Sequence, residues 1–486
     1  MHLVSYSQAE EGSFVARSSS AAREPLDPAL VRLVLILAVG AIAPALDSTI
    51  VNVALPTLVR AFGASVAQLQ WAITGYLLAL GMAMPVTAWA ADRYGAKRLW
   101  LISLALFLLG SVLAGTSWSV ASLIAFRVLQ GIGAGLLQPL LQTLVVRAAG
   151  PGRLGRAITV VTYVIVVAPI LGPVVGGLIV DHASWRWIFY VNVPICLAAL
   201  VLAARGLDET AQRRGGPLDV LGLGLLSPAL AAILYGLASA GAKGGFGGAD
   251  TVVPLAVGLL LLAAFGAHEL GQRKPALDLR LFRERSFAVS SALLFLGGLS
   301  IYGGLLLLTL YYQTLRGDSP LLAGLLLAPQ GVGSLLTRWT GGLADRIGAR
   351  PIVLLGLLLA ALGTLPFALA GQGTGEVGLS VALLVRGAGL SAATIGIMTA
   401  AYHGLRPDQV GHASGATRIV AQVGGSFGAA VLAMVLSRQA ALHQALGAAG
   451  RAAAFRDAFG WSIAFTLLAF ASAFLLPGHE AARRTA

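Results

Sequence analysis

Residues 31–56 read VRLVLILAVGAIAPALDSTIVNVALP, a run that is apolar at nearly every position. It exceeds the about 20 residues that an α-helix needs to cross a membrane. Similar runs recur along the 486-residue chain, in which 57% of residues are hydrophobic and only 11% are charged. Soluble domains carry about 25% charged residues, so the composition predicts an integral membrane protein. Backbone polar groups in lipid must be satisfied within each segment, and the repeated runs therefore predict an all-α bundle.

Fourteen apolar segments can be placed between polar or arginine-rich joints. They lie near residues 31–57, 69–91, 99–116, 120–146, 156–180, 187–204, 219–240, 252–270, 287–313, 320–343, 351–370, 378–401, 411–437 and 460–477. With an even number of spans both termini share one side, and basic residues should gather on the cytoplasmic joints. Roughly two thirds of the 33 Lys and Arg residues lie on the joints that share a side with the N-terminus. This pattern predicts a multi-pass protein of the cell membrane with both termini in the cytoplasm.

The formal net charge of +13 is therefore interpreted as a topology signal. A nucleic-acid partner is not expected, because the basic residues are scattered over short joints and form no continuous patch. The single cysteine, Cys196, cannot form an internal disulfide. Residues 1–30 lack the pattern of a cleaved signal peptide, so the first span is expected to direct its own insertion.

Two joints carry nearly the same sequence, AWAADRYGAKR at 88–98 and TGGLADRIGAR at 340–350. Arg127 and Arg386, and the stretches LGRA at 154–157 and VGHA at 410–413, repeat with nearly the same spacing. Such a repeat indicates duplication. The second copy of the joint follows the first after eight spans, whereas two adjacent six-span halves would give a spacing of six. We therefore predict two pseudo-symmetric six-helix halves with two extra helices inserted between them. The expected divisions are a disordered cytoplasmic tail at 1–30, a first half at 31–205, an inserted hairpin at 206–272, a second half at 273–478 and a tail at 479–486.

Five motifs carry a resemblance to a known family. They are LDSTIVNVALP at 46–56, ADRYGAKR at 91–98, RVLQGIGAG at 127–135, GPVVGG at 172–177 and WRWIFYVNVP at 185–194. Together they resemble the major facilitator superfamily, in its fourteen-span drug:proton antiporter branch of multidrug resistance exporters. The resemblance covers about residues 31–477. It implies an antiporter that uses the proton motive force to export amphipathic molecules, such as drugs or antibiotics, by alternating access.

The joint after the second span is implied by the resemblance to be a conformational latch. Its residues are Asp92, Arg93, Gly95, Lys97 and Arg98, with Asp345 and Arg346 in the second half. The alternative is that the joint only sets topology and a tight turn, which Gly95 permits. The recurrence of the acid favours the latch, since topology alone does not require it.

Small residues and prolines follow one face of the fifth span. They are Pro169, Gly172, Pro173, Gly176 and the adjacent Gly177. Proline kinks a helix and glycine lets a neighbour approach, so ordinary packing explains them. The resemblance instead implies a bend that marks antiporters, and on it we favour antiport over symport.

Asp47 lies roughly 20 Å from each flank of the first span at 1.5 Å per residue, close to the middle of the bilayer. An acid at that depth costs on the order of 3 kcal/mol and is usually functional. No other Asp or Glu falls in the middle of a predicted span. We therefore predict that Asp47 carries the proton, with Arg127 of the fourth span as its partner. A purely structural pair is the alternative, and both roles can hold because an acid that exchanges an arginine for a proton is a switch.

A polar stripe on the fourth span should face the protein interior or a water-filled cavity. The predicted substrate cavity is lined by Asn52, Trp71, Tyr76, Gln130, Gln138, Gln142, Tyr302, Gln330 and Gln422. Tyr311 and Tyr312 lie near a span end and are expected to anchor the membrane interface. GIGAG at 131–135 is predicted to serve close helix packing.

Other functions fit the sequence less well. A dedicated exporter of one endogenous metabolite remains open. A membrane-embedded enzyme or a channel is more remote, because the chain shows no HExxH motif or phosphate loop, and two rocking halves suit alternating access. No metal or cofactor is predicted. The expected partners are protons, membrane lipid and a neutral, monocationic or anionic amphiphile. The protein is expected to be a monomer.

Overall fold

The computed structural model describes residues 28–209, 219–243, 247–272, 279–337, 340, 343, 347–371, 373–402, 407–443 and 447–477. These residues form helices joined by short turns, with no strand among them. The first helices are α2 (Pro28–Phe62), α3 (Val66–Tyr94), α4 (Ala96–Gly115), α5 (Val120–His182), α6 (Trp187–Tyr190) and α7 (Asn192–Gly206). The pair α8 (Val220–Lys243) and α9 (Ala249–Gly271) follows. The remaining helices are η1 (Leu279–Arg283), α10 (Arg285–Gly298), η2 (Leu299–Gly303), α11 (Gly304–Leu310), η3 (Tyr311–Arg316), α12 (Pro320–Leu336), α14 (Ala349–Leu369), α15 (Glu376–Tyr402), α16 (Pro407–Leu442) and α17 (Gly447–Ala473). We call α2–α7 the N-terminal helices and α10–α17 the C-terminal helices.

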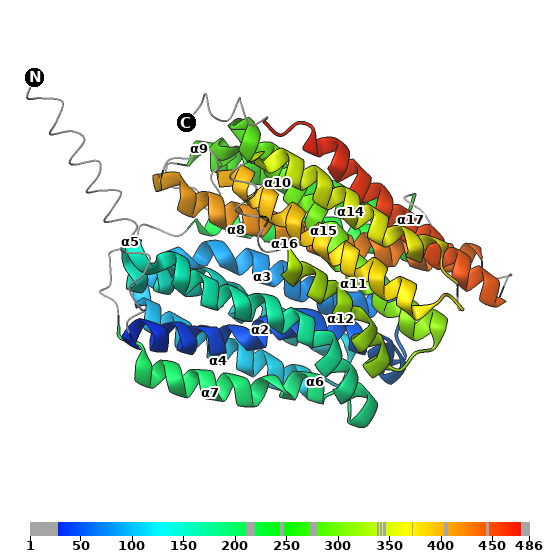
Figure 1. Ribbon diagram of the computed structural model, residues 1–486, viewed down its shortest axis with the longest axis horizontal. Coiled ribbons are helices and arrows are strands. Elements are labelled where there is room, and N and C mark those ends of the chain that lie inside the picture. Colours follow the sequence, from blue (N-terminus) through cyan, green and yellow to red (C-terminus); the bar gives the residue numbers. More distant parts are fainter. Residues whose placement is uncertain are drawn as a thin grey trace, which may run out of the picture.

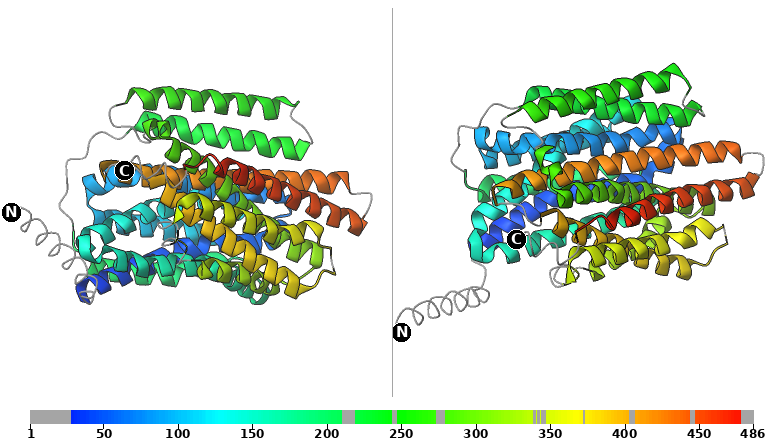
Figure 2. Two further views of the ribbon diagram at one scale, coloured as in Figure 1. Left: turned by 45° about the horizontal axis from the view of Figure 1, so that its top comes forward. Right: turned by 90° about the horizontal axis from the view of Figure 1, so that it is seen from above.

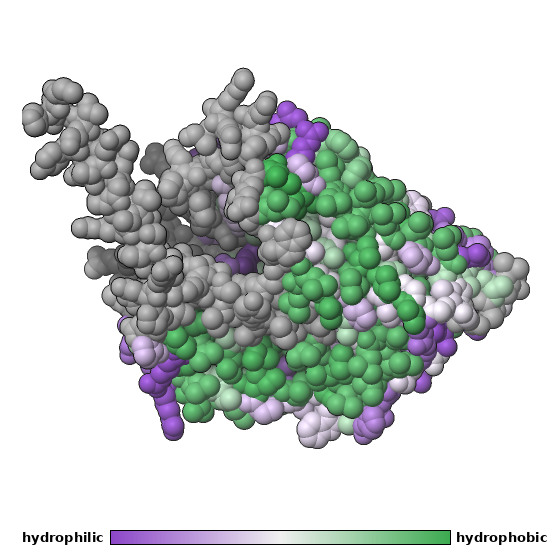
Figure 3. All heavy atoms as spheres, viewed as in Figure 1, coloured by the Kyte–Doolittle hydropathy of each residue, from purple (hydrophilic) through white to green (hydrophobic). Residues whose placement is uncertain are grey.

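The long helices lie side by side, and α2 begins and α17 ends at the same end of the bundle, which we call the inner end (Figure 1). Hydrophilic residues gather toward the ends of the bundle, and apolar residues cover the flank between them (Figure 3). Leu260 and Leu369 are 71% and 75% exposed on the bundle. So much exposed apolar surface is unfavourable in water and marks a lipid-facing flank. The prediction of an all-helical membrane protein is confirmed.

Eleven helices in the described residues are long and apolar enough to cross a membrane. Two shorter apolar helices, Leu171–His182 and Pro320–Leu336, overlap the predicted spans near 156–180 and 320–343. The predicted span near 460–477 lies largely within α17, which is not among these helices. The count of fourteen spans therefore stays a prediction.

α5 is one helical run of 63 residues, where the sequence predicts two spans. A straight helix of this length would be about 95 Å long, far more than the bilayer thickness. Arg127 and Gly172 would lie about 68 Å apart along it, yet both contact α2 around Asp47. The run therefore folds back on itself into a first arm, Val120–Val145, and a second arm, Leu171–His182.

The pair α8 and α9 packs together at one edge of the bundle, as the two green helices of Figure 2 show. α8 also contacts α3 and α16, so the pair touches both the N-terminal and the C-terminal helices. An apolar cavity of about 630 Å³ lies between α3, α5 and α8, and its lining includes Trp71 and Pro228.

The two similar joints of the sequence share one backbone conformation. Gly95 has φ 88° and ψ 145°, and Gly348 has φ 90° and ψ 157°. Each glycine directly precedes a helix, α4 or α14, and a positive φ of this kind favours glycine. The local structure thus explains why both copies of the joint keep this glycine.

GIGAG at 131–135 brings α3 and α4 close to α5. A Cβ atom at Gly131 would lie 2.5 Å from the Tyr76 carbonyl oxygen, and one at Gly135 would lie 2.2 Å from that of Leu80. A Cβ atom at Gly133 would lie 2.6 Å from the Phe107 amide nitrogen. The prediction that these glycines serve helix packing is confirmed.

The apolar core differs between the two ends of the bundle. At the end away from Pro28, the outer end, one cluster of buried residues joins the N-terminal and C-terminal helices. Toward the inner end, separate clusters fill the N-terminal and the C-terminal helices. Tyr311 and Tyr312 are fully buried in the shared cluster, because Phe367 and Phe459 of α14 and α17 cover them. The expectation that these tyrosines anchor the membrane interface is wrong.

Candidate functional site

The buried carboxylate of Asp47 is the centre of the site. Asp47 and Arg127 are 0% and 1% exposed, and Nη1 of Arg127 donates to Oδ2 of Asp47. The side-chain amides of Gln130 and Asn192 each donate to Oδ1 at 3.0 Å. Both oxygens of Asp47 thus face hydrogen-bond donors, and such a set of donors suits an acceptor-only carboxylate.

Arg127 is fixed by further contacts around its guanidinium group. Nε donates to the Ala72 carbonyl at 3.1 Å, and Nη1 donates to Oε1 of Gln130 at 2.6 Å. The guanidinium carbon lies 4.0 Å from the centre of the Tyr76 ring, within cation–π range. The Tyr76 hydroxyl in turn donates to the Pro44 carbonyl at 3.3 Å. α3 and α5 therefore hold the arginine in one orientation toward α2.

Ser111 of α4 joins the two amides that contact Asp47. Its hydroxyl oxygen accepts from Gln130 and Asn192 at 2.9 Å each, and its hydroxyl donates to the Phe189 carbonyl at 3.1 Å. Sequence reasoning missed Ser111 and Asn192. A signal existed for Asn192, because Asn52 and Asn192 are the two asparagines of the chain, and both interrupt apolar runs. A buried amide requires hydrogen-bond partners and so predicts a polar neighbour.

This arrangement links proton binding to structure. A proton on Asp47 would remove the counter-charge of Arg127 and require an acceptor where donors now point. Removing one partner of a buried ion pair costs about 3–5 kcal/mol, since the other charge is left uncompensated. Proton binding at Asp47 would therefore require Arg127, Gln130 or Asn192 to rearrange.

Arg386 of α15 is 1% exposed and has neutral acceptors. Nε donates to the Thr364 hydroxyl at 3.2 Å, and Nη2 donates to the carbonyl of Ser300, in the π-helical turn η2, at 2.9 Å. Nη1 donates to Oε1 of Gln330. Among the described residues no carboxylate pairs with Arg386.

The residues of the predicted bend lie on the second arm of α5 and contact two neighbouring helices, α2 and α12. A Cβ atom at Gly172 would lie 2.1 Å from Oγ1 of Thr49 in α2. One at Gly176 would lie 2.7 Å from Cγ1 of Ile50 in the same helix. The next face of the arm packs against α12, as the following contacts show. A Cβ atom at Gly177 would lie 2.3 Å from the Pro320 carbonyl oxygen, and one at Gly324 would lie 2.1 Å from that of Pro173. The sequence placed Gly172, Pro173 and Gly176 on one face, whereas the two glycines contact α2 and Pro173 contacts α12. The side chain of Pro169 lies outside the described residues.

The joint of the predicted latch is covered by Glu209, just after α7. The Glu209 carboxylate lies against Gly95 and 3.6 Å from Nε of Arg98. Arg93 lies over the ring of Trp89, 5.8 Å from its centre. Asp92 and Lys97 are half-buried in the same joint, while Asp345 and Arg346 lie outside the described residues. The Glu209 contact is therefore made within the N-terminal helices.

Two residues predicted for the cavity lie between the N-terminal and C-terminal helices. Gln138 accepts a hydrogen bond of 2.8 Å from Arg418 of α16. Gln422 packs on α3, where a Cβ atom at Gly81 would lie 3.5 Å from its side chain. The structure thus brings these two glutamines to the boundary where a cavity of a two-part transporter is expected.

The other predicted cavity residues are more dispersed. Asn52 is buried and donates to the Thr49 carbonyl at 3.4 Å. Trp71 lines the apolar cavity against α8. Tyr302 packs on Gly425, and Gln142 is half-buried on α5. The structure therefore does not bring all nine residues into one site.

A separate polar cluster joins the start of α8 to the end of α9. Nε2 of His268 in α9 lies 2.8 Å from Oδ1 of Asp219, which precedes α8. Burial acts to raise the pKa of Asp219, and hydrogen bonds with the Gly222 amide and His268 outweigh it. The pKa of Asp219 therefore lies below its ordinary value, and the carboxylate is a stable partner for His268.

Comparisons with known proteins agree with this architecture. The sequence profile of the Major Facilitator Superfamily matches residues 37–429. The chain is 37% identical over 418 residues to the multidrug resistance protein B homolog of Mycobacterium tuberculosis, covering 85% of this chain and 77% of that protein. The chain belongs to the major facilitator superfamily. The tetracenomycin C resistance and export protein of Streptomyces glaucescens is similar to this superfamily member, with 35% identity over 407 residues, covering 83% and 75% of the two chains.

A solved structure has the same fold as this superfamily member. It is a bacterial homologue of the human lysosomal transporter Spinster in an inward-facing, unoccupied conformation, with a TM-score of 0.68 and 18% identity. The match covers 95% of this chain and 98% of that chain.

Proposed function

We propose that the protein is a proton-coupled antiporter that exports amphipathic small molecules, such as drugs or antibiotics, by alternating access. The names of the relatives, a multidrug resistance protein and a tetracenomycin C export protein, support export as the activity. One observation carries the coupling: the mid-span carboxylate of Asp47 is fully buried and bound to Arg127. A buried ionisable group within a membrane span is by default a functional site.

Asp47 is coupled to the rest of the bundle through the second arm of α5. Gly172 contacts α2 at Leu46 and Thr49, on either side of Asp47. The neighbouring Pro173 contacts Gly324 of α12. A shift of α2 when Asp47 binds a proton therefore moves the arm that packs against the C-terminal helices. This path gives the antiporter motif its role in the proposed cycle.

Opening to the outside requires breaking contacts at the outer end. Nε2 of Gln313 donates to the Val53 carbonyl at 2.7 Å, and the Leu321 amide donates to Asp181 at 3.0 Å. Both contacts join N-terminal to C-terminal helices. The shared apolar core at the same end, against separate cores at the inner end, supports a state that is closed outward.

The topology is part of the proposal. Fourteen spans form two six-helix halves around the α8–α9 hairpin in the cell membrane, and both termini face the cytoplasm. The basic joints support this orientation, because positive residues remain on the cytoplasmic side. The chain acts as a monomer, since substrate and proton sites lie within one bundle.

The test is proton movement in everted membrane vesicles. Wild-type vesicles energised by respiration are given a fluorescent amphipathic dye, and dye uptake and substrate-induced proton efflux are recorded. Asp47→Asn should abolish both, while the folded protein stays in the membrane. Asp457→Asn, which alters a surface acid paired with His443, is the matched control and should transport normally. Full coupled transport by Asp47→Asn would exclude Asp47 as the proton carrier.

A dedicated exporter of one endogenous metabolite is the alternative. A growth-inhibition panel in an efflux-deficient host separates the two functions. Protection against several unrelated amphiphiles supports multidrug export, and protection against one compound supports the dedicated exporter.

A further inference from the structure

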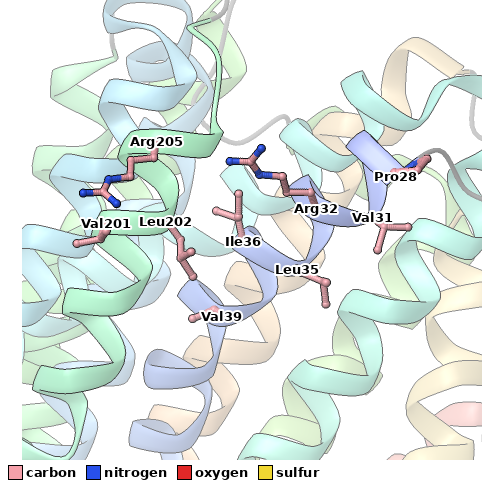
Figure 4. Close-up of a pocket in the computed structure, with 9 residues that line it drawn as sticks. All are labelled: Pro28, Val31, Arg32, Leu35, Ile36, Val39, Val201, Leu202 and Arg205. Atoms are coloured by element: carbon pink, nitrogen blue, oxygen red, sulfur yellow. The ribbon is translucent and has the colours of Figure 1, made fainter.

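A groove opens on the flank of the bundle between α2 and α7, at the inner end (Figure 4). Its volume is about 700 Å³. It is lined by Pro28, Val31, Arg32, Leu35, Ile36, Val39, Val201, Leu202 and Arg205. Leu35, Val201 and Leu202 are 51%, 50% and 43% exposed, so the groove faces the surroundings of the bundle and not its interior.

The two arginines lie at the same level because the helices run in opposite directions. α2 begins at the inner end, so Arg32 precedes the apolar Leu35 and Val39, while α7 ends there, so Arg205 follows Val201 and Leu202. Figure 4 shows Arg32 reaching from α2 toward α7. A Cβ atom at Gly206, next to Arg205, would lie 3.7 Å from Nε of Arg32. Two positive groups therefore cap one end of an apolar groove.

Among the described residues, the lining of the groove holds two arginines and no carboxylate to balance their charge. Glu209, four residues after Arg205, pairs with Arg98 in the neighbouring joint. A guanidinium group offers paired donors that match a phosphate group.

We propose that this groove binds one anionic phospholipid of the inner leaflet. The phosphate lies on Arg32 and Arg205, and an acyl chain lies along Leu35, Val39 and Leu202. Basic pockets between transmembrane helices on the cytoplasmic side bind anionic lipid headgroups by this chemistry. A phosphatidylcholine headgroup fits less well, because its quaternary ammonium group would meet the second arginine.

The site goes beyond the proposed transport activity, and its placement in the inner leaflet rests on the topology proposed above. α2 also carries Asp47, and α7 begins at Asn192, which donates to Asp47. A lipid held between the inner ends of these helices braces the two elements that hold the carboxylate. Anionic lipid should therefore stabilise the folded protein more than zwitterionic lipid does.

The test is native mass spectrometry of the purified full chain with phosphatidylglycerol or phosphatidylcholine of matched acyl chains. The wild type should retain phosphatidylglycerol selectively. Arg32→Ala with Arg205→Ala should weaken that binding about tenfold or more, since each surface arginine contributes to anionic-lipid attraction. Arg451→Ala with Arg456→Ala removes the same charge from exposed positions of α17 and should bind as the wild type does.

A second variant tests the acyl chain separately from the charge. Leu35→Trp with Leu202→Trp fills the groove and keeps both arginines, and it should also lose selective phosphatidylglycerol binding. Melting curves check that each variant is folded. Unchanged phosphatidylglycerol binding by either groove variant, equal binding of both lipids by the wild type, or a dimer whose amount follows protein concentration and not lipid would each overturn the proposal.

Discussion

Arg127 and Arg386 are both 1% exposed and repeat with the duplicated sequence, but their neighbours differ in charge. Arg127 contacts the carboxylate of Asp47. Arg386 contacts the hydroxyl of Thr364 and the uncharged oxygens of Gln330 and Ser300. The same buried cation is thus balanced by an acid in the N-terminal helices and by neutral acceptors in the C-terminal helices.

This difference assigns different capacities to the two sites. An ion pair changes its net charge when the carboxylate binds a proton, so the Arg127 site can respond to proton concentration. Neutral acceptors do not titrate near neutral pH, so the Arg386 site stays positive and fixes η2, α12 and α14 to α15 through hydrogen bonds. In the proposed cycle, the Arg127 site is therefore the proton switch and the Arg386 site is not.

Removing each arginine gives the largest expected contrast. Arg127→Ala leaves Asp47 buried without its counter-charge and should lower the free energy of unfolding by about 3–5 kcal/mol. Arg386→Ala leaves neutral groups unpaired and should lower it by about 1–3 kcal/mol. Thermal unfolding of both variants in the same detergent measures the difference. Equal destabilisation would contradict the assignment of the charged pair to one site only.

The two asparagines sharpen the comparison at the level of single hydrogen bonds. Asn192→Ala removes a donor to the Asp47 carboxylate and should cost about 1.5–3 kcal/mol, the range for bonds to charged groups. Asn52→Ala removes a 3.4 Å bond to a backbone carbonyl and should cost about 1 kcal/mol or less. Substrate-driven proton flux should fall in the first variant and persist in the second. A greater loss from Asn52→Ala would show that Asn192 does not support the carboxylate.

Placing an acid beside Arg386 tests the comparison from the other side. Gln330→Glu replaces a neutral acceptor by a carboxylate, and a charge-assisted bond is about twice as strong as a neutral one. We expect a gain of about 1 kcal/mol, seen as a higher melting temperature in detergent. Gln142→Glu, at a half-buried position with no arginine partner among the described residues, is the control. A lower melting temperature for Gln330→Glu would mean that the neutral environment of Arg386 rejects an ion pair.

Depth and repetition made part of the site predictable from sequence. Asp47 stood out because an acid in the middle of an apolar span is costly and is usually functional. Arg127 stood out because it is one of the few arginines within the spans and lies on a polar face. The packing role of GIGAG followed from the small size of its residues.

The rest of the site depends on contacts that helical periodicity does not encode. Ser111 and Asn192 are 81 residues apart in the chain and meet only because α4 and α7 pack side by side. Tyr311 and Tyr312 were misplaced because a rule for span ends does not reveal that Phe367 and Phe459 cover them. Both failures concern which helix lies next to which, and the helical periodicity of each segment does not reveal its neighbours.

The most direct test of the account is substrate-induced proton release from the purified protein. An exported dye is added to the wild type and to Asp47→Asn in weakly buffered solution containing a pH indicator. The account predicts that the wild type releases protons in proportion to bound dye, and that Asp47→Asn binds dye without release. Equal proton release by the two proteins would contradict the assignment of Asp47 as the group where substrate and proton compete.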